Sequence, residues 1–118
     1  MMKLFILLSA TLFLACVSTS HATTAKVKGI VTKTVIADEG RWGGCMVRID
    51  QKLADSGLDC PSKWVSFSCS GVFTEKDVAY RMFDQAQMAL TLERTVEIRV
   101  DDTKKHNGYC YGNRIDIF

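Results

Sequence analysis

Few residues in this sequence suit acid–base, nucleophilic or metal chemistry. Beyond residue 22 the only histidine, His106, lies in a Lys-Lys-His-Asn-Gly run that is typical of a solvated turn. Asp101 and Asp102 are adjacent, so on an extended strand they point to opposite faces and make a poor acid–base pair. Lys104 and Lys105 place cations where a calcium loop would need oxygen ligands. We therefore expect no catalytic residue, no metal, no cofactor and no enzymatic activity.

A second group of residues suits ligand binding. Trp42, Tyr109 and Tyr111 fall in stretches rich in Gly, Asn or Asp, and Asn107 and Asp102 lie near the tyrosines. Flat aromatic faces beside amides and carboxylates are what a sugar site uses. The alternative is that Trp42 caps one end of the fold and the tyrosines pack over a disulfide. These five residues are our candidate ligand-binding residues.

The cysteines indicate a structural role. Four of the five follow residue 22, namely Cys45, Cys60, Cys69 and Cys110. An even number in a short exported chain is typical of two disulfides, for which three pairings exist. No Cys-x-x-Cys pair is present, which argues against zinc.

The N-terminal residues form a pattern typical of a signal peptide. Lys3 precedes a mainly apolar run over residues 4–17, shorter than the roughly 20 residues that a spanning helix needs. Ser20-His21-Ala22 then places small residues at positions −3 and −1 of a cut before Thr23. We expect a signal peptide over residues 1–22 and export to the periplasm or the medium.

Cys16 leaves one alternative open. A lipoprotein signal also ends its apolar run at a cysteine, and Ala15 fits the position before it. Leu14 and Phe13 fit that pattern poorly, so we favour cleavage before Thr23 over an acylated Cys16.

Length and composition limit the classes of protein. The 118 residues suffice for one domain, which we place at residues 23–118. Lys and Arg number 15 against 13 Asp and Glu, a balance too even for a protein that binds nucleic acid. Hydrophobic residues make up 47% and charged residues 24%, which is typical of a folded globular chain.

The hydrophobic periodicity predicts strands around one helix. Apolar alternation predicts strands over residues 26–36, 45–50, 64–69, 95–101 and 114–118. The alternation slips near Gly29, as a bulge would make it. Apolar residues spaced three and four apart, from Val78 to Leu90, predict a helix that starts at Thr74 and runs to Glu93.

This order predicts a mostly β domain with one helix, arranged β-β-β-α-β-β. In about 95 residues that order fits a five-stranded OB-fold-like barrel whose helix lies between the third and fourth strands.

The same fold favours one disulfide pairing. If strands 45–50 and 64–69 form a hairpin that pairs Cys45 with Cys69, the register also pairs Val47 with Phe67. Cys60 is then left with Cys110, and these two precede strands that run parallel in an OB-fold. We therefore predict Cys45–Cys69 and Cys60–Cys110.

Three longer runs carry a resemblance. Residues 41–48 (RWGGCMVR), 76–84 (KDVAYRMFD) and 101–110 (DDTKKHNGYC) resemble a family of small uncharacterised exported proteins of marine gammaproteobacteria. The layout is also similar, more distantly, to the OB-fold B subunits of subtilase-cytotoxin and typhoid-toxin type, on Cys45, Cys69 and Val96-Glu97-Ile98-Arg99-Val100. That resemblance implies pentamers that bind cell-surface glycans. The sugar-binding serine of those subunits corresponds to residues 41–44, which contain no serine, so their site does not carry over.

Two functions follow as expectations. The first is a secreted or periplasmic, non-catalytic binding module of unknown ligand. The alternative is a glycan-binding, ring-forming toxin-like B subunit. We expect neither a nucleic-acid partner nor a membrane span, and homo-oligomerisation stays open.

Overall fold

The computed structural model describes residues 14–16, 23–38 and 40–118. Most of the predicted signal peptide, with its cleavage motif at residues 20–22, lies outside the described residues. Cys16 is described, and it is an exposed free cysteine. No helix in the described ranges is long and apolar enough to cross a membrane.

The described chain is mostly β with one α-helix, as predicted. The elements in chain order are β1 (Thr24–Ile36), the 3-10 helix η1 (Arg41–Gly44), β2 (Cys45–Ile49), the 3-10 helix η2 (Leu53–Ser56), β3 (Trp64–Ser66), α1 (Lys76–Leu92), β4 (Thr95–His106) and β5 (Tyr109–Ile117).

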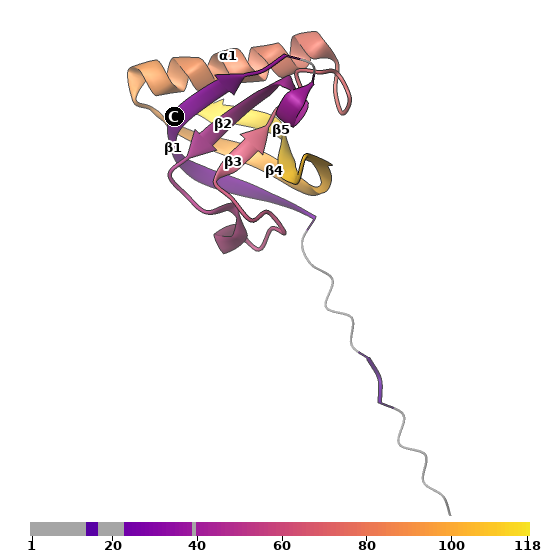
Figure 1. The fold of residues 1–118 in the computed structure, drawn as a ribbon. Coiled ribbons are helices and arrows are strands. Elements are labelled where there is room, and N and C mark those ends of the chain that lie inside the picture. The colour runs from indigo at the N-terminus through magenta and orange to yellow at the C-terminus, as the bar shows by residue number, and fades with distance from the viewer. Residues whose placement is uncertain (1–13, 17–22, 39) are drawn as a thin grey trace, which may run out of the picture.

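The five strands form one sheet that closes into a ring (Figure 1). Its spatial order is β1-β2-β3-β5-β4, with β4 paired back onto β1, so the spatial order differs from the order along the chain. β3 and β5 are parallel and meet at the single pair Ser66 and Tyr111, while the other neighbours are antiparallel. Figure 1 shows α1 along one side of the ring and η2 on the opposite side.

β1 is long enough to pair with two strands. Residues 24–30 pair with β4, and residues 31–36 pair with β2. The register shifts between Val31 and Lys33, so the bulge predicted at Gly29 is wrong in its position. Gly29 instead makes room for Asp50, because a Cβ on Gly29 would lie 2.6 Å from Asp50 Oδ1, the atom that accepts the Ile30 N–H.

The helix begins at Lys76, two residues later than predicted. Glu75 is the N-cap residue and makes no side-chain cap, and Thr74 lies outside the helix. The preceding segment is anchored elsewhere, since the Phe73 N–H donates to Ser68 Oγ at 3.0 Å. The buried face of α1 contains Ala79, Met82, Phe83, Ala86 and Ala89. Val78, predicted to be part of that face, is 42% exposed.

The β2–β3 register is two residues away from the prediction. Val47 pairs with Val65 rather than with Phe67. A shift of two keeps every side chain on its predicted face, so Val47, Val65 and Phe67 are all fully buried. β3 also ends early, at Ser66, because Ser68 adopts a left-handed backbone with φ 61°.

Both disulfides form in the structure with the expected partners, Cys45–Cys69 and Cys60–Cys110. Cys69 lies beyond the end of β3, and its Cα is 5.6 Å from the Cα of Cys45.

The last two strands are longer than predicted. β4 extends to His106 and β5 begins at Tyr109, with register shifts between Arg99 and Val100 and between Asp101 and Lys105. These bulges interrupt the alternation of apolar side chains on which the sequence prediction depends.

Candidate functional site

The segment η1 lies against the turn between β4 and β5. The Trp42 N–H donates to Asn107 Oδ1 at 3.0 Å, and Ser66 Oγ donates to the Trp42 carbonyl at 2.8 Å. Trp42 itself has a left-handed backbone, with φ 52°. The structure therefore brings the candidates Trp42 and Asn107 together, with Trp42 half-buried in a 3-10 helix rather than free in a loop.

Next to Trp42, a serine and a histidine form a pair. His106 Nε2 lies 2.9 Å from Ser68 Oγ, a separation that a nucleophile and its general base would also have. Ser68 is fully buried, however, and its Oγ also accepts the Phe73 N–H. Burial lowers the pKa of His106 and so favours the neutral ring. This pair joins the β4–β5 hairpin to the segment before α1.

Both tyrosine candidates differ from the prediction. Tyr111 lies within β5 and is only 5% exposed, so its assignment to an exposed loop is wrong. Its ring packs against Phe73, with centroids 5.5 Å apart. Tyr109 is also in β5, paired with His106, and is half-buried. Tyr111 pairs with Asp101 of β4 on one side and with Ser66 of β3 on the other, so β5 lies between two strands at this residue.

The fifth candidate, Asp102, lies at a hollow that we call the acidic cavity. It has a volume of about 530 Å³ and is lined by Thr23, Gly57, Leu58, Asp59, Asp102 and Thr103. Asp102 and Thr103 belong to the stretch of β4 that bulges between Asp101 and Lys105. The remaining lining residues are Thr23, directly before β1, and residues 57–59 of the loop before Cys60.

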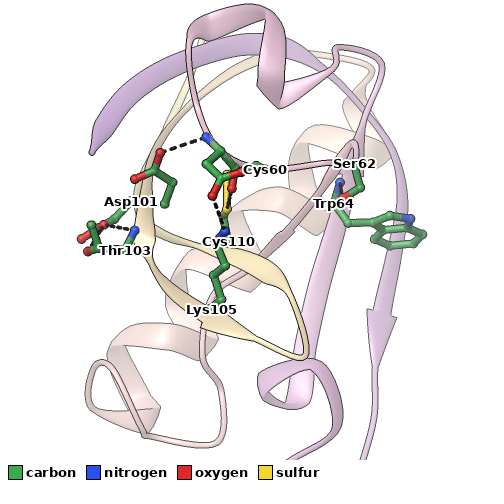
Figure 2. Close-up of a disulfide and its surroundings, with 9 residues drawn as sticks. Cys60, Ser62, Trp64, Asp101, Thr103, Lys105 and Cys110 are labelled. Atoms are coloured by element: carbon green, nitrogen blue, oxygen red, sulfur yellow. Dashed lines mark hydrogen bonds and ion pairs between the residues drawn. A yellow bond between two sulfur atoms is a disulfide. The ribbon is translucent and has the colours of Figure 1, made fainter. Parts of the chain in front are cut away.

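Hydrogen bonds hold the walls of the acidic cavity together. Asp102 Oδ2 accepts the Asp59 N–H at 2.9 Å, and the Asp102 N–H donates to the Thr23 carbonyl at 2.8 Å. Lys105 Nζ lies 3.3 Å from Asp59 Oδ2. The Cys60–Cys110 disulfide fixes the residues next to both walls (Figure 2).

The neighbouring carboxylate Asp101 is held in place by Thr103. Burial raises the pKa of Asp101, but hydrogen bonds from the Thr103 hydroxyl and N–H, with the nearby charges of Lys104 and Arg99, outweigh it, so the pKa lies below its usual value. The two bonds to Asp101 Oδ1 are 2.6 Å and 2.9 Å long. They fix the start of the bulge, on which Asp102 also lies.

Trp64 is part of neither the Trp42–Asn107 contact nor the lining of the acidic cavity. Figure 2 shows its ring pointing away from the disulfide and from Asp101, Thr103 and Lys105. Lys33 Nζ lies 6.0 Å from the centre of the Trp64 ring.

Within the described ranges, no group of three or more His, Cys, Asp and Glu side chains is placed to hold a metal ion.

Most of the cavity was missed at the level of sequence. Only Asp102 was a candidate, while Thr23, Asp59 and Thr103 were not. The disulfide prediction contains a usable signal, because a Cys60–Cys110 bond brings Asp59 close to the β4–β5 hairpin. The sequence contains no signal that places Thr23 at this cavity, because its position depends on the pairing of β1 with β4.

Comparison with known proteins leaves the family open. No family model matches this chain, and no curated protein or solved structure is similar enough to it to assign one.

Proposed function

We propose that this protein is an exported, non-catalytic binding module that takes a hydroxyl-rich ligand, of the glycan class, in the acidic cavity. The observation that carries the proposal is the state of Asp102. Its Oδ2 is engaged by the Asp59 N–H, and no hydrogen bond from the described residues engages its Oδ1. A carboxylate held by one oxygen keeps the other available as an acceptor for a ligand hydroxyl.

The lining of the cavity supports this ligand chemistry. Thr23 and Thr103 add hydroxyl groups, and both residues are exposed. Leu58, which is 4% exposed, adds an apolar wall. Lys105 neutralises part of the charge of Asp59, which reduces the attraction for cations and favours a neutral polar ligand.

The arrangement of Ser68 and His106 supports the non-catalytic part of this proposal. This pair has the separation of a catalytic dyad, but Ser68 is 0% exposed, so a substrate has no access to its hydroxyl.

We further propose that the closed sheet is an OB-type barrel. Three features support this assignment: the parallel contact of β3 with β5, the pairing of β1 with both β2 and β4, and the position of α1 between β3 and β4 in the chain. We also propose that the protein is exported, which the two disulfides support because such bonds persist in oxidising compartments. Cleavage before Thr23 rests on the sequence of residues 20–22 alone.

One observation favours a second candidate function, the ring-forming glycan-binding subunit. Apolar side chains on the outer face of α1 are exposed: Tyr80 by 43%, Met88 by 56% and Leu92 by 60%. Such residues could form an interface between copies of the chain. Native mass spectrometry distinguishes a monomer from a closed ring.

The test of the main proposal is a glycan array probed with the exported protein of known native mass. Binding should fall at least about tenfold in Asp102→Asn and in Thr23→Val, because each removes one charged or hydroxyl contact from the lining of the cavity. Asn at position 102 retains an acceptor for the Asp59 N–H, which protects the fold. The matched control is Asp84→Asn, an exposed carboxylate on α1. Loss of binding in the control, or unchanged binding in both cavity variants, would rule out this site.

A further inference from the structure

A second hollow lies between α1 and β5, and it shares no residue with the acidic cavity. We call it the α1–β5 groove. Its volume is about 460 Å³. Its lining consists of Val78, Arg81, Met82 and Gln85 from α1 and of residues 113–115 from β5.

The groove follows an edge of β5 that has no strand beside it. β3 pairs with β5 only at Tyr111, and from there to Ile117 no described strand continues on that side. Asn113 is the extra residue of a bulge, since Arg99 pairs with Arg114 and Val100 pairs with Gly112. α1 packs beside this part of β5 (Figure 1).

The backbone of β5 points into the groove at Ile115. The Ile115 carbonyl accepts a hydrogen bond of 3.2 Å from Gln85 Nε2. In an antiparallel strand the N–H and C=O of one residue point to the same side, so the Ile115 N–H also faces away from β4. Two residues on, Ile117 has the same orientation. The Gln85 amide therefore occupies the place of a peptide N–H from an additional strand.

Gln85 is exposed and could move aside. An incoming peptide would replace its one hydrogen bond with a ladder of main-chain bonds to Ile115 and Ile117. Residues 113–117 would accommodate about five residues of extended chain, roughly 15 Å.

The charges beside the groove select an anionic partner. Arg114 is paired with Asp116 through Nε at 3.0 Å, and its side chain is still 60% exposed. Arg81 makes no ion pair with any described residue, although Asp77 and Asp84 lie near it on the helix. Met82 and Ile115 are buried and Val78 is 42% exposed, so the floor is apolar while the rim is cationic.

We propose that the α1–β5 groove binds a short extended peptide that carries a carboxylate. The peptide adds to the free edge of β5 as a strand, its apolar side chains lie on Val78 and Met82, and its carboxylate is held between Arg81 and Arg114. This site goes beyond the proposed function, because it uses a different surface and a different class of ligand.

The test is an NMR titration of the ¹⁵N-labelled exported protein with both disulfides formed. The probe is the peptide acetyl-Thr-Val-Asp-Val-Thr-amide, compared with the same peptide carrying Asn in place of Asp. Probe at about 1 mM should shift the amide signals of Ile115 and Ile117 and the side-chain NH₂ signal of Gln85. The Asn peptide should bind about threefold to fivefold more weakly, as the loss of an exposed ion pair predicts.

Two variants locate the carboxylate. Arg81→Gln should weaken binding of the Asp peptide about threefold to fivefold and leave binding of the Asn peptide unchanged. Arg41→Gln, an exposed arginine on η1, is the matched control and should leave both affinities unchanged.

Three results would overturn the proposal. The first is the absence of shifts at Ile115 and Ile117 at about 1 mM probe. The second is equal affinity for the Asp and Asn peptides. The third is the appearance of the same shifts on concentrating the protein without peptide, which would assign the groove to a second copy of this chain. The glycan array is independent of all three, so either site can fail alone.

Discussion

Gly43 is the residue whose substitution most sharply tests the packing of η1 against the β4–β5 turn. It has a left-handed backbone, with φ 73°. A Cβ at this position would lie 2.5 Å from His106 Cδ2 and would also overlap Ser66 Oγ. Gly43→Ala should therefore displace both side chains, in addition to straining the backbone.

The size of the effect follows from these two contributions. A left-handed alanine costs about 1–2 kcal/mol. The displacement also weakens the Ser66–Trp42 and His106–Ser68 hydrogen bonds, each of which contributes about 1 kcal/mol. We expect Gly43→Ala to lower the free energy of unfolding by about 3–5 kcal/mol, with a share from overpacking.

Two other glycines provide matched controls. Gly57 has φ 80° and Gly108 has φ 86°, and a Cβ at either position would meet no atom within 4 Å. Gly57→Ala and Gly108→Ala should therefore cost only the backbone strain, about 1–2 kcal/mol.

The assay is urea unfolding under non-reducing conditions, with the slope m required to be the same in all four proteins. If Gly43→Ala destabilises the protein no more than the two controls do, the contact between η1 and the hairpin is loose and the argument fails.

Three further predictions concern the core, the histidine and a disulfide. Tyr111→Ala should lower the free energy of unfolding by about 3–4 kcal/mol, because Tyr111 is buried. Trp42→Ala should lower it by only about 1–2 kcal/mol, because Trp42 is half-buried. Equal losses of stability in urea unfolding would contradict this. Since burial lowers the pKa of His106 in the folded protein, the unfolded chain takes up the proton more readily, and stability should decrease as the pH falls below about 6.5. His106→Gln should reduce that decrease in urea midpoints measured from neutral to acidic pH, and an unchanged pH profile would refute it. Replacing Cys60 and Cys110 together by Ala should cost about 4 kcal/mol, from a crosslink across 50 residues, and a loss below about 1 kcal/mol would exclude that contribution.

The strands and the helix could be predicted from the sequence because they depend on local patterns. Period-two alternation located β1 and β2, and the spacing of Met82, Phe83 and Ala86 located α1. The disulfide partners followed from which strands are neighbours. They tolerated a β2–β3 register two residues from the predicted one, since such a shift preserves the faces of both strands.

Only the tertiary structure decided the lengths of β4 and β5, the burial of Tyr111 and the two hollows. The bulges at Asn113 and between Asp101 and Lys105 break the alternation, so no local pattern records that these residues are paired. The acidic cavity depends on contacts between Thr23, Asp59 and Asp102, which are far apart along the chain. The sequence by itself thus determined which segments become strands or helix, because side-chain periodicity is local. The sites are made by residues that meet only when the sheet closes, and so they required the fold.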